Sequence, residues 1–196
     1  MSKNRQFTAA EFPSSAQLSN ELERSRYRRS SAVVLRSILY TLITAAAILV
    51  IAAAFFLPIL RIYGSSMNPT LTDGDIIVTM QSGEYKPGDI IAFYCNDKVL
   101  TKRVIANTGD WVDIDKEGNV SVNGEVLRER YVTDKAFGET NIDLPYQVPE
   151  NRVFVLGDNR SISVDSRNTS VGCVAEEQIV GKAAFRIWPL SRLGKT

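Results

Sequence analysis

Histidine is absent from all 196 residues of the chain. A Ser-His-Asp triad is therefore excluded, because no side chain can supply its imidazole base. A serine hydroxyl becomes a useful nucleophile at neutral pH only when a neighbouring group takes its proton. Any serine chemistry in this chain thus requires a lysine or a carboxylate as the base.

Cysteine is scarce as well, with only Cys95 and Cys173 present. Two cysteines are too few for a disulfide framework, and their spacing is not that of a metal site. An oxidising exterior would permit one bridge between them, but the sequence does not show that they meet. The bridge stays an open alternative, and neither residue needs a catalytic role.

Charge is missing from the 24 residues 37–60. As a helix with a rise of ~1.5 Å per residue, this stretch is about 36 Å long and can cross a ~30 Å hydrocarbon core. The core helix of a soluble domain is disfavoured, because such helices rarely run this long without a charge. A cleavable signal peptide is disfavoured too, because the small residues 45–47 and 52–54 lie inside the apolar run. We therefore expect a retained transmembrane anchor over 37–60.

Basic residues concentrate before the apolar run. Residues 1–36 carry seven Lys or Arg against three Glu, whereas the part after Leu60 carries 16 basic and 19 acidic residues. Basic residues beside a span stay in the cytoplasm, so the pattern predicts a cytoplasmic segment 1–36 and an exterior part 61–196. A basic cluster can also bind nucleic acid, but beside a transmembrane segment the topogenic interpretation is favoured.

The exterior part is long enough for one modest domain and consists of short β-type runs broken by Gly, Asp and Asn. The runs expected to be strands are 75–80, 89–94, 99–106, 111–115, 153–156 and 179–188. Asn123-Gly124 predicts a tight hairpin, because both residues accept positive φ angles. We therefore expect a mainly β fold, a folded barrel or sandwich, with an inserted β-ribbon over about 110–150.

Two segments of this domain carry groups suited to serine chemistry, the serine-rich turn 64–71 and the strand around Lys102. Alternate side chains of a strand share a face, so Lys102 lies with Leu100 and Val104. Burial against apolar neighbours can lower the pKa of a lysine by ~3–5 units from ~10.4. A surface lysine whose stem lies along the sheet is the competing interpretation.

A third segment, 157–167, follows the apolar run 153–156 and is rich in small and polar residues. Such residues can orient a lysine or pair charges in a tight loop. Asp165 and Arg167, two positions apart, are expected to form a structural ion pair rather than to act directly on a substrate.

Four motifs, in this order and after an N-terminal anchor, resemble those of the bacterial type I signal peptidases, which are membrane-bound serine proteases with a Ser/Lys dyad. The motifs are Gly64 to Leu71, Gly74 to Ile77, Lys102 to Ile105, and Gly157 to Arg167. The resemblance extends over the anchor and essentially all of Tyr63 to Arg192.

By position, the resemblance implies that Ser66 is the nucleophile and Lys102 the general base. It implies that Ser163 hydrogen-bonds and orients the lysine. Asp165 and Arg167 match the family's structural charged pair.

The resemblance also implies an oxyanion site and a selective pocket. The Ser66 backbone N–H would donate to the oxyanion, and Gly64 stands where some members use a serine hydroxyl as the second donor, so that donor is left open. Met67 and Leu71 match residues of a pocket that admits only small side chains. No metal or cofactor is implied.

The implied activity is endoproteolytic removal of signal peptides from exported preproteins after a small residue. It implies a single-pass protein of the bacterial cytoplasmic membrane, with a cytoplasmic N-terminus and a catalytic domain on the outer face. The implied partners are these signal peptides, the lipid bilayer and, by proximity, the secretion translocon, but not nucleic acid.

Two other functions compete with this interpretation. A self-cleaving repressor of the SOS type shares the dyad, but it would need a DNA-binding helix-turn-helix in place of the anchor. A membrane-tethered β module that binds secretory or pilus substrates without cleaving them stays open, although this chain keeps both members of the dyad.

Overall fold

The computed structural model describes residues 14–196, without the side chains of 25–32 and 53–56. It divides into an N-terminal unit that ends at Ala53 and a second unit, Ala54–Thr196, each described here on its own. Residues 1–13 of the predicted cytoplasmic segment lie outside the described residues.

The described part of the first unit is formed by one helix, α1 (Ser15–Phe56), whose last three residues belong to the second unit. Ser14 caps its start, since Ser14 Oγ accepts from the Gln17 N–H at 3.3 Å and the Gln17 side chain accepts from the Ser14 N–H at 2.9 Å. Within α1, Val33–Ala52 has a mean hydropathy of 2.2 and is fully exposed, so it is long and apolar enough to cross a membrane. The helix is longer than the predicted span at its start and ends before Leu60.

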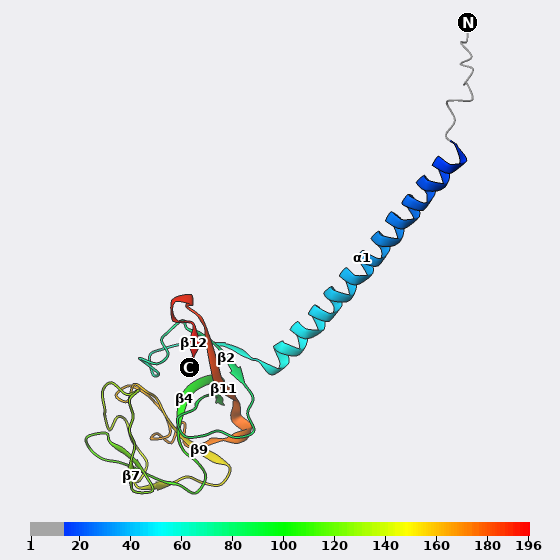
Figure 1. The fold of residues 1–196 in the computed structure, drawn as a ribbon. Helices are drawn as coiled ribbons and strands as arrows, with labels where there is room; N and C mark the ends of the chain where they lie inside the picture. Colours follow the sequence, from blue (N-terminus) through cyan, green and yellow to red (C-terminus); the bar gives the residue numbers. More distant parts are fainter. Residues whose placement is uncertain (1–13) are drawn as a thin grey trace. The chain divides into compact units, whose positions relative to one another are not determined.

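The main sheet of the second unit is antiparallel and holds eight strands, whose hydrogen-bonded order places β4 between β3 and β9. Figure 1 labels β2, β4, β9, β11 and β12 of this sheet. In chain order the strands are β1 (Ile59–Arg61), β2 (Ile76–Met80), β3 (Ile90–Cys95), β4 (Lys98–Ala106), β9 (Arg152–Leu156), β10 (Val174–Ala175), β11 (Ile179–Trp188) and β12 (Gly194–Lys195). Two 3₁₀ turns flank β11, η2 (Glu176–Gln178) and η3 (Leu190–Arg192). Ile59 and Leu60, which the sequence assigned to the anchor, pair with β2.

A smaller sheet forms within the region predicted as a β-ribbon. Its order is β7 (Glu125–Val126), β6 (Val120–Val122), β5 (Trp111–Ile114) and β8 (Tyr146–Gln147). The predicted hairpin is confirmed, because Val122 pairs with Glu125 across Asn123 and Gly124, at φ angles of 52° and 84°.

Three apolar clusters hold the second unit together. One joins the small sheet to the main sheet through Val112, Phe154 and Leu156. The second packs around Ile91, Val104 and Val155 in the middle of the main sheet. The third lies beneath the segment between β1 and β2 and is built from Ile62, Met67, Leu71, Ile77, Ile90 and Ala183. The predicted mainly β fold after an apolar N-terminal helix is thus confirmed.

The two cysteines are both free thiols in this fold. Cys95 is half-buried at the end of β3, and its Sγ lies 3.7 Å from the Ser170 carbonyl oxygen. Cys173 is buried, and the loss of hydration raises the pKa of its thiol to about 11. The bridge that the sequence left open is therefore not formed.

Candidate active site

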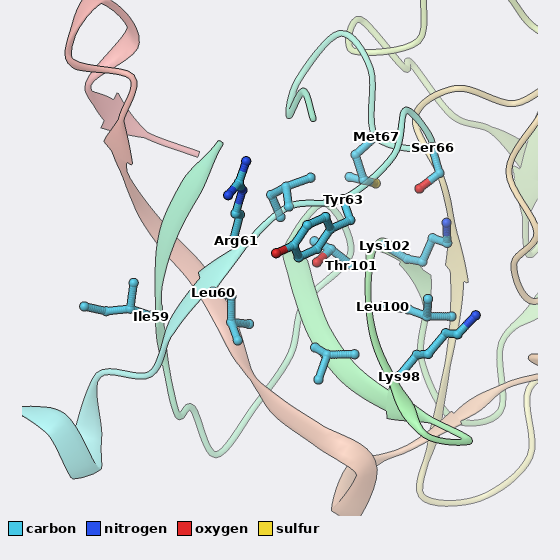
Figure 2. A pocket seen from close by; sticks show the side chains of 12 residues that line it. Ile59, Leu60, Arg61, Tyr63, Ser66, Met67, Lys98, Leu100, Thr101 and Lys102 are labelled. Carbon is cyan, nitrogen blue, oxygen red and sulfur yellow. The ribbon is translucent and has the colours of Figure 1, made fainter. Parts of the chain in front are cut away.

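Ser66 and Lys102 line the same cleft, which has a volume of about 700 Å³. Its walls come from the start of β4 on one side and from β1 and the segment after it on the other (Figure 2). The lining residues are Ile59, Leu60, Arg61, Ile62, Tyr63, Ser66, Met67, Lys98, Val99, Leu100, Thr101 and Lys102. Figure 2 shows Ser66 and Lys102 at the same end of this cleft, with the Lys102 amine pointing toward Ser66.

Ser66 is positioned by the loop that connects β1 to β2. Gly64, two residues before it, has φ +84°, a left-handed conformation that favours glycine. The Gly64 N–H donates to Asp73 Oδ1 at 2.8 Å, so a carboxylate at the far end of the loop fixes this turn. Leu71 closes the loop, because its N–H donates to the Met67 carbonyl at 2.9 Å.

Lys102 is buried, with only 3% of its surface exposed, and all residues from Lys102 to Ala106 are buried, so both faces of this half of β4 are covered. Burial disfavours the ammonium form and lowers the pKa of Lys102 to about 8. The carboxylates of Asp165 and Asp158 favour the charged form and oppose this shift, whereas the Arg167 guanidinium adds to it. At pH 7 a lysine with this pKa is neutral in about one molecule in ten.

The segment after β9 packs directly against the serine loop. A Cβ at Gly157 would lie 2.2 Å from Ser163 Oγ and 2.6 Å from the Ser66 backbone oxygen, so only glycine fits there. Asn159 ties the two loops together, since its N–H donates to the Ser66 carbonyl at 3.0 Å and its Nδ2 to the Ser65 carbonyl at 3.3 Å. These bonds set the position of the Ser66 backbone relative to the loop 157–167.

Asp165 and Arg167 form the ion pair that the sequence predicts, and both are almost completely buried. Arg167 donates twice to the carboxylate, from Nε at 2.8 Å and from Nη2 at 2.8 Å. Asp165 also accepts the Gly157 N–H at 3.0 Å, and Arg167 Nη1 donates to the Phe137 carbonyl at 2.8 Å. The pair therefore joins the two ends of the loop 157–167 and ties this loop to the segment around Phe137.

Ser163 lies beside Gly157, in the loop next to Ser66, but the predicted hydrogen bond from Ser163 to Lys102 is not formed in the structure. Its side chain is buried, and within the part of the chain described its Oγ has no hydrogen-bond partner. A buried hydroxyl normally has such a partner. The assignment of Ser163 to Lys102 therefore stays a prediction.

The remaining predicted site residues take different positions. Met67 lines the cleft and is buried. Leu71 lies in the core cluster behind Met67 and is not among the lining residues. Gly64 offers no free N–H to an oxyanion, because Asp73 accepts it.

Two buried ion pairs beside the site could not be predicted from the sequence near either partner. Arg103 donates to Asp158 from Nε at 2.8 Å and from Nη2 at 2.6 Å, and its guanidinium lies 3.9 Å from the Tyr131 ring centroid. Arg160 pairs with Glu129, from 31 residues earlier, and its Nε donates to the Gly157 carbonyl at 3.0 Å. The motifs contain Arg103, Asp158 and Arg160, but only the fold reveals their partners.

Comparison with known proteins assigns this arrangement to a family. Residues 35–188 match the family model described as signal peptidase, peptidase S26. The chain belongs to this family. It is therefore a peptidase. The family is membrane-anchored, and the described part of this chain has an N-terminal apolar helix long enough to cross a membrane.

Curated relatives agree with this membership. Signal peptidase IB of Staphylococcus aureus (strain COL) is 37% identical over 164 residues, which cover 74% of this chain and 84% of the relative. Signal peptidase I of Bacillus licheniformis is 34% identical over 161 residues, 76% of this chain and 85% of the relative. A crystal structure of a signal peptidase I from Enterococcus faecalis V583 is 28% identical, with a TM-score of 0.44, over 52% of this chain and 97% of that one.

Proposed function

We propose that the chain removes signal peptides from exported preproteins by a Ser/Lys dyad, with Ser66 as nucleophile and Lys102 as general base. The observation that carries the proposal is a half-buried serine and, in the same largely apolar cleft, a buried lysine whose amine points toward it. Membership of the signal peptidase family supports the choice of substrate.

In the acylation step, neutral Lys102 takes the proton from Ser66 Oγ as this oxygen attacks the carbonyl carbon of the scissile peptide bond. The tetrahedral intermediate then collapses, the C–N bond breaks, and the lysine ammonium passes its proton to the leaving amine. The product is an acyl-enzyme ester on Ser66 and a free mature chain with a new N-terminus.

In the deacylation step, the neutral lysine activates a water molecule that hydrolyses the ester and releases the signal peptide. The Ser66 N–H has no acceptor among the described residues, so it is available to the developing oxyanion. Met67 stands at the wall of the cleft beside Ser66 and limits the side chain before the scissile bond to a small one.

For the membrane arrangement we propose a single span by α1, a cytoplasmic N-terminus and an outer catalytic domain beside the translocon. The support is the basic residues before the apolar segment Val33–Ala52. Protease added to sealed cells should digest the part after Leu60 and spare residues 1–30. Protection of the Ser66 region until the cells are lysed would reverse the orientation.

The experiment that tests the activity uses two adjacent serines. Ser66→Ala should abolish cleavage of a preprotein by the purified enzyme, because the nucleophile is gone. Ser65→Ala is the matched control and should keep substantial activity, because it has no covalent role. Stoichiometric binding of the preprotein by the wild type without any cleavage would instead support a non-catalytic module.

A further inference from the structure

A second cavity, of about 210 Å³, is formed by residues that follow Ser66 in the chain and by the loop that binds the Ser66 carbonyl. Its walls are Asn68, Pro69, Thr133, Asp134, Asp158 and Asn159. It shares none of these residues with the cleft that holds Ser66 and Lys102. The nucleophile loop therefore contributes to two cavities, with Ser66 and Met67 in the larger one and Asn68 and Pro69 in the smaller one.

An extended substrate has to cross Ser66 with its scissile bond at the hydroxyl. Its acyl part occupies the larger cleft, because that cleft contains Met67, the wall for the residue before the scissile bond. The part after the scissile bond has to leave in the other direction, past Asn68 and Asn159. Asn159, a wall of the second cavity, donates its N–H to the Ser66 carbonyl at 3.0 Å, so this cavity adjoins the nucleophile. An extended chain advances about 3.3 Å per residue, so the first residues after the scissile bond are the ones that can reach it.

The charge of this second cavity is negative. Both oxygens of Asp158 accept hydrogen bonds from Arg103, so that carboxylate is neutralised. Asp134 is exposed and has no hydrogen bond or ion pair within residues 14–196. The neighbouring Lys135 is directed elsewhere, since its Nζ donates to Asn119 Oδ1 at 2.7 Å. Asp134 is thus an uncompensated carboxylate at the rim of the cavity.

We infer that this cavity is the subsite for the start of the mature chain and that Asp134 selects a basic side chain there. The inference rests on the proposed peptidase function and names a preference of the same site. It also gives the smaller sheet a role, because Thr133 and Asp134 belong to the connection between its strands β7 and β8.

The test uses synthetic peptides with alanine before the scissile bond and with Lys, Gln or Glu at each of the first three positions after it. At one of these positions kcat/KM should be about fivefold or more higher for Lys than for Glu, the ratio of one charge–charge contact near a surface. The ratio should shrink in 1 M salt, where charges are screened beyond about 3 Å. Asp134→Lys should reverse the preference.

The matched control is Asp143→Lys, the same charge change at an exposed position that lines neither cavity. It should leave the Lys/Glu ratio unchanged. If Asp134→Lys and Asp143→Lys changed the Lys/Glu ratio equally, the effect would come from net charge alone, and the inferred subsite would be overturned. Equal cleavage of all peptides by the wild type would overturn the inference and leave the proposed function intact. No cleavage of any peptide or preprotein would overturn both.

Discussion

The two faces of strand β4 each bury a cation, and they surround it in opposite ways. On one face, Arg103 donates to both oxygens of Asp158 and to the Gly88 carbonyl, and it stacks on Tyr131. On the other face, Lys102 has no carboxylate partner within the described chain, and it shares this face with Leu100 and Val104, which belong to an apolar cluster. Adjacent residues of one strand thus hold a compensated and an uncompensated charge.

This difference in surroundings gives Arg103 a structural role and makes Lys102 suited to a chemical one. The Arg103 guanidinium is held by two charge-assisted hydrogen bonds to Asp158, so its role is to fix the loop that contains this carboxylate. A buried lysine without a partner releases its proton near neutral pH, so Lys102 can act as a base. The two roles differ because Arg103 has the Asp158 carboxylate as its counter-ion, whereas Lys102 has none within the described residues.

The largest effect is expected from making the Lys102 face resemble the Arg103 face. Lys102→Arg keeps the positive charge, but an arginine does not release its proton and so cannot act as a base. Preprotein cleavage should therefore fall by about 10³-fold or more. Lys102→Ala should be equally inactive. The measurement is kcat on a preprotein, with circular dichroism to show that both variants fold. An active, folded arginine variant would assign proton abstraction to another residue.

The next effect comes from breaking the compensated face. Asp158→Asn leaves the Arg103 guanidinium buried beside a neutral amide, and the free energy of unfolding should fall by about 3–5 kcal/mol. Denaturant unfolding measures this change. The partly exposed pair of Lys182 and Asp89 gives the control, because its lysine side chain keeps 42% of its surface in water and Lys182→Met should change stability by less than about 1 kcal/mol.

The same variant tests the electrostatic link between the two faces. The Asp158 carboxylate favours the ammonium form of Lys102 and raises its pKa. Its removal should therefore shift the rising limb of the pH–rate profile to lower pH. A shift to higher pH would contradict this account of the Lys102 pKa.

A smaller effect, in the opposite direction, is expected from removing the uncompensated charge. The pKa of Lys102 is about 8 against an ordinary 10.5, so the folded state binds this proton more weakly than the unfolded state. The resulting loss of stability is complete below pH 8 and disappears as the pH rises toward 10.5. Lys102→Met should therefore stabilise the protein by about 3 kcal/mol at pH 6–7, and by progressively less above pH 8. A gain that does not change with pH would point to packing alone.

The placement of Lys102 and Arg103 on opposite faces of β4 follows from the sequence, because successive side chains of a strand alternate between its faces. Period-two patterning predicted the strand and the burial of Lys102 with Leu100 and Val104, and Asn123-Gly124 predicted the hairpin. The contacts between distant segments could not be derived in this way. Glu129 meets Arg160 and Asp73 meets Gly64 only because the chain folds back, and nothing in either neighbourhood marks a partner. Leu71 shares a core cluster with Met67 and is not among the residues that line the cleft, so its place in the substrate pocket stays a prediction.

The smallest effect concerns Ser163, whose buried hydroxyl has no partner in the described chain and lies beside Gly157, which packs against Ser66. If this hydroxyl orients the Lys102 amine, Ser163→Ala should lower the plateau of the rate by about tenfold, because the base remains but is held less well. The midpoint of the pH–rate profile should stay near the Lys102 pKa of about 8, because burial is the main cause of that value. Ser161→Ala is the control, since that exposed serine bonds Asn159 Oδ1 and should leave the plateau nearly unchanged. A Ser163→Ala enzyme with a full plateau would show that the lysine is positioned by packing alone.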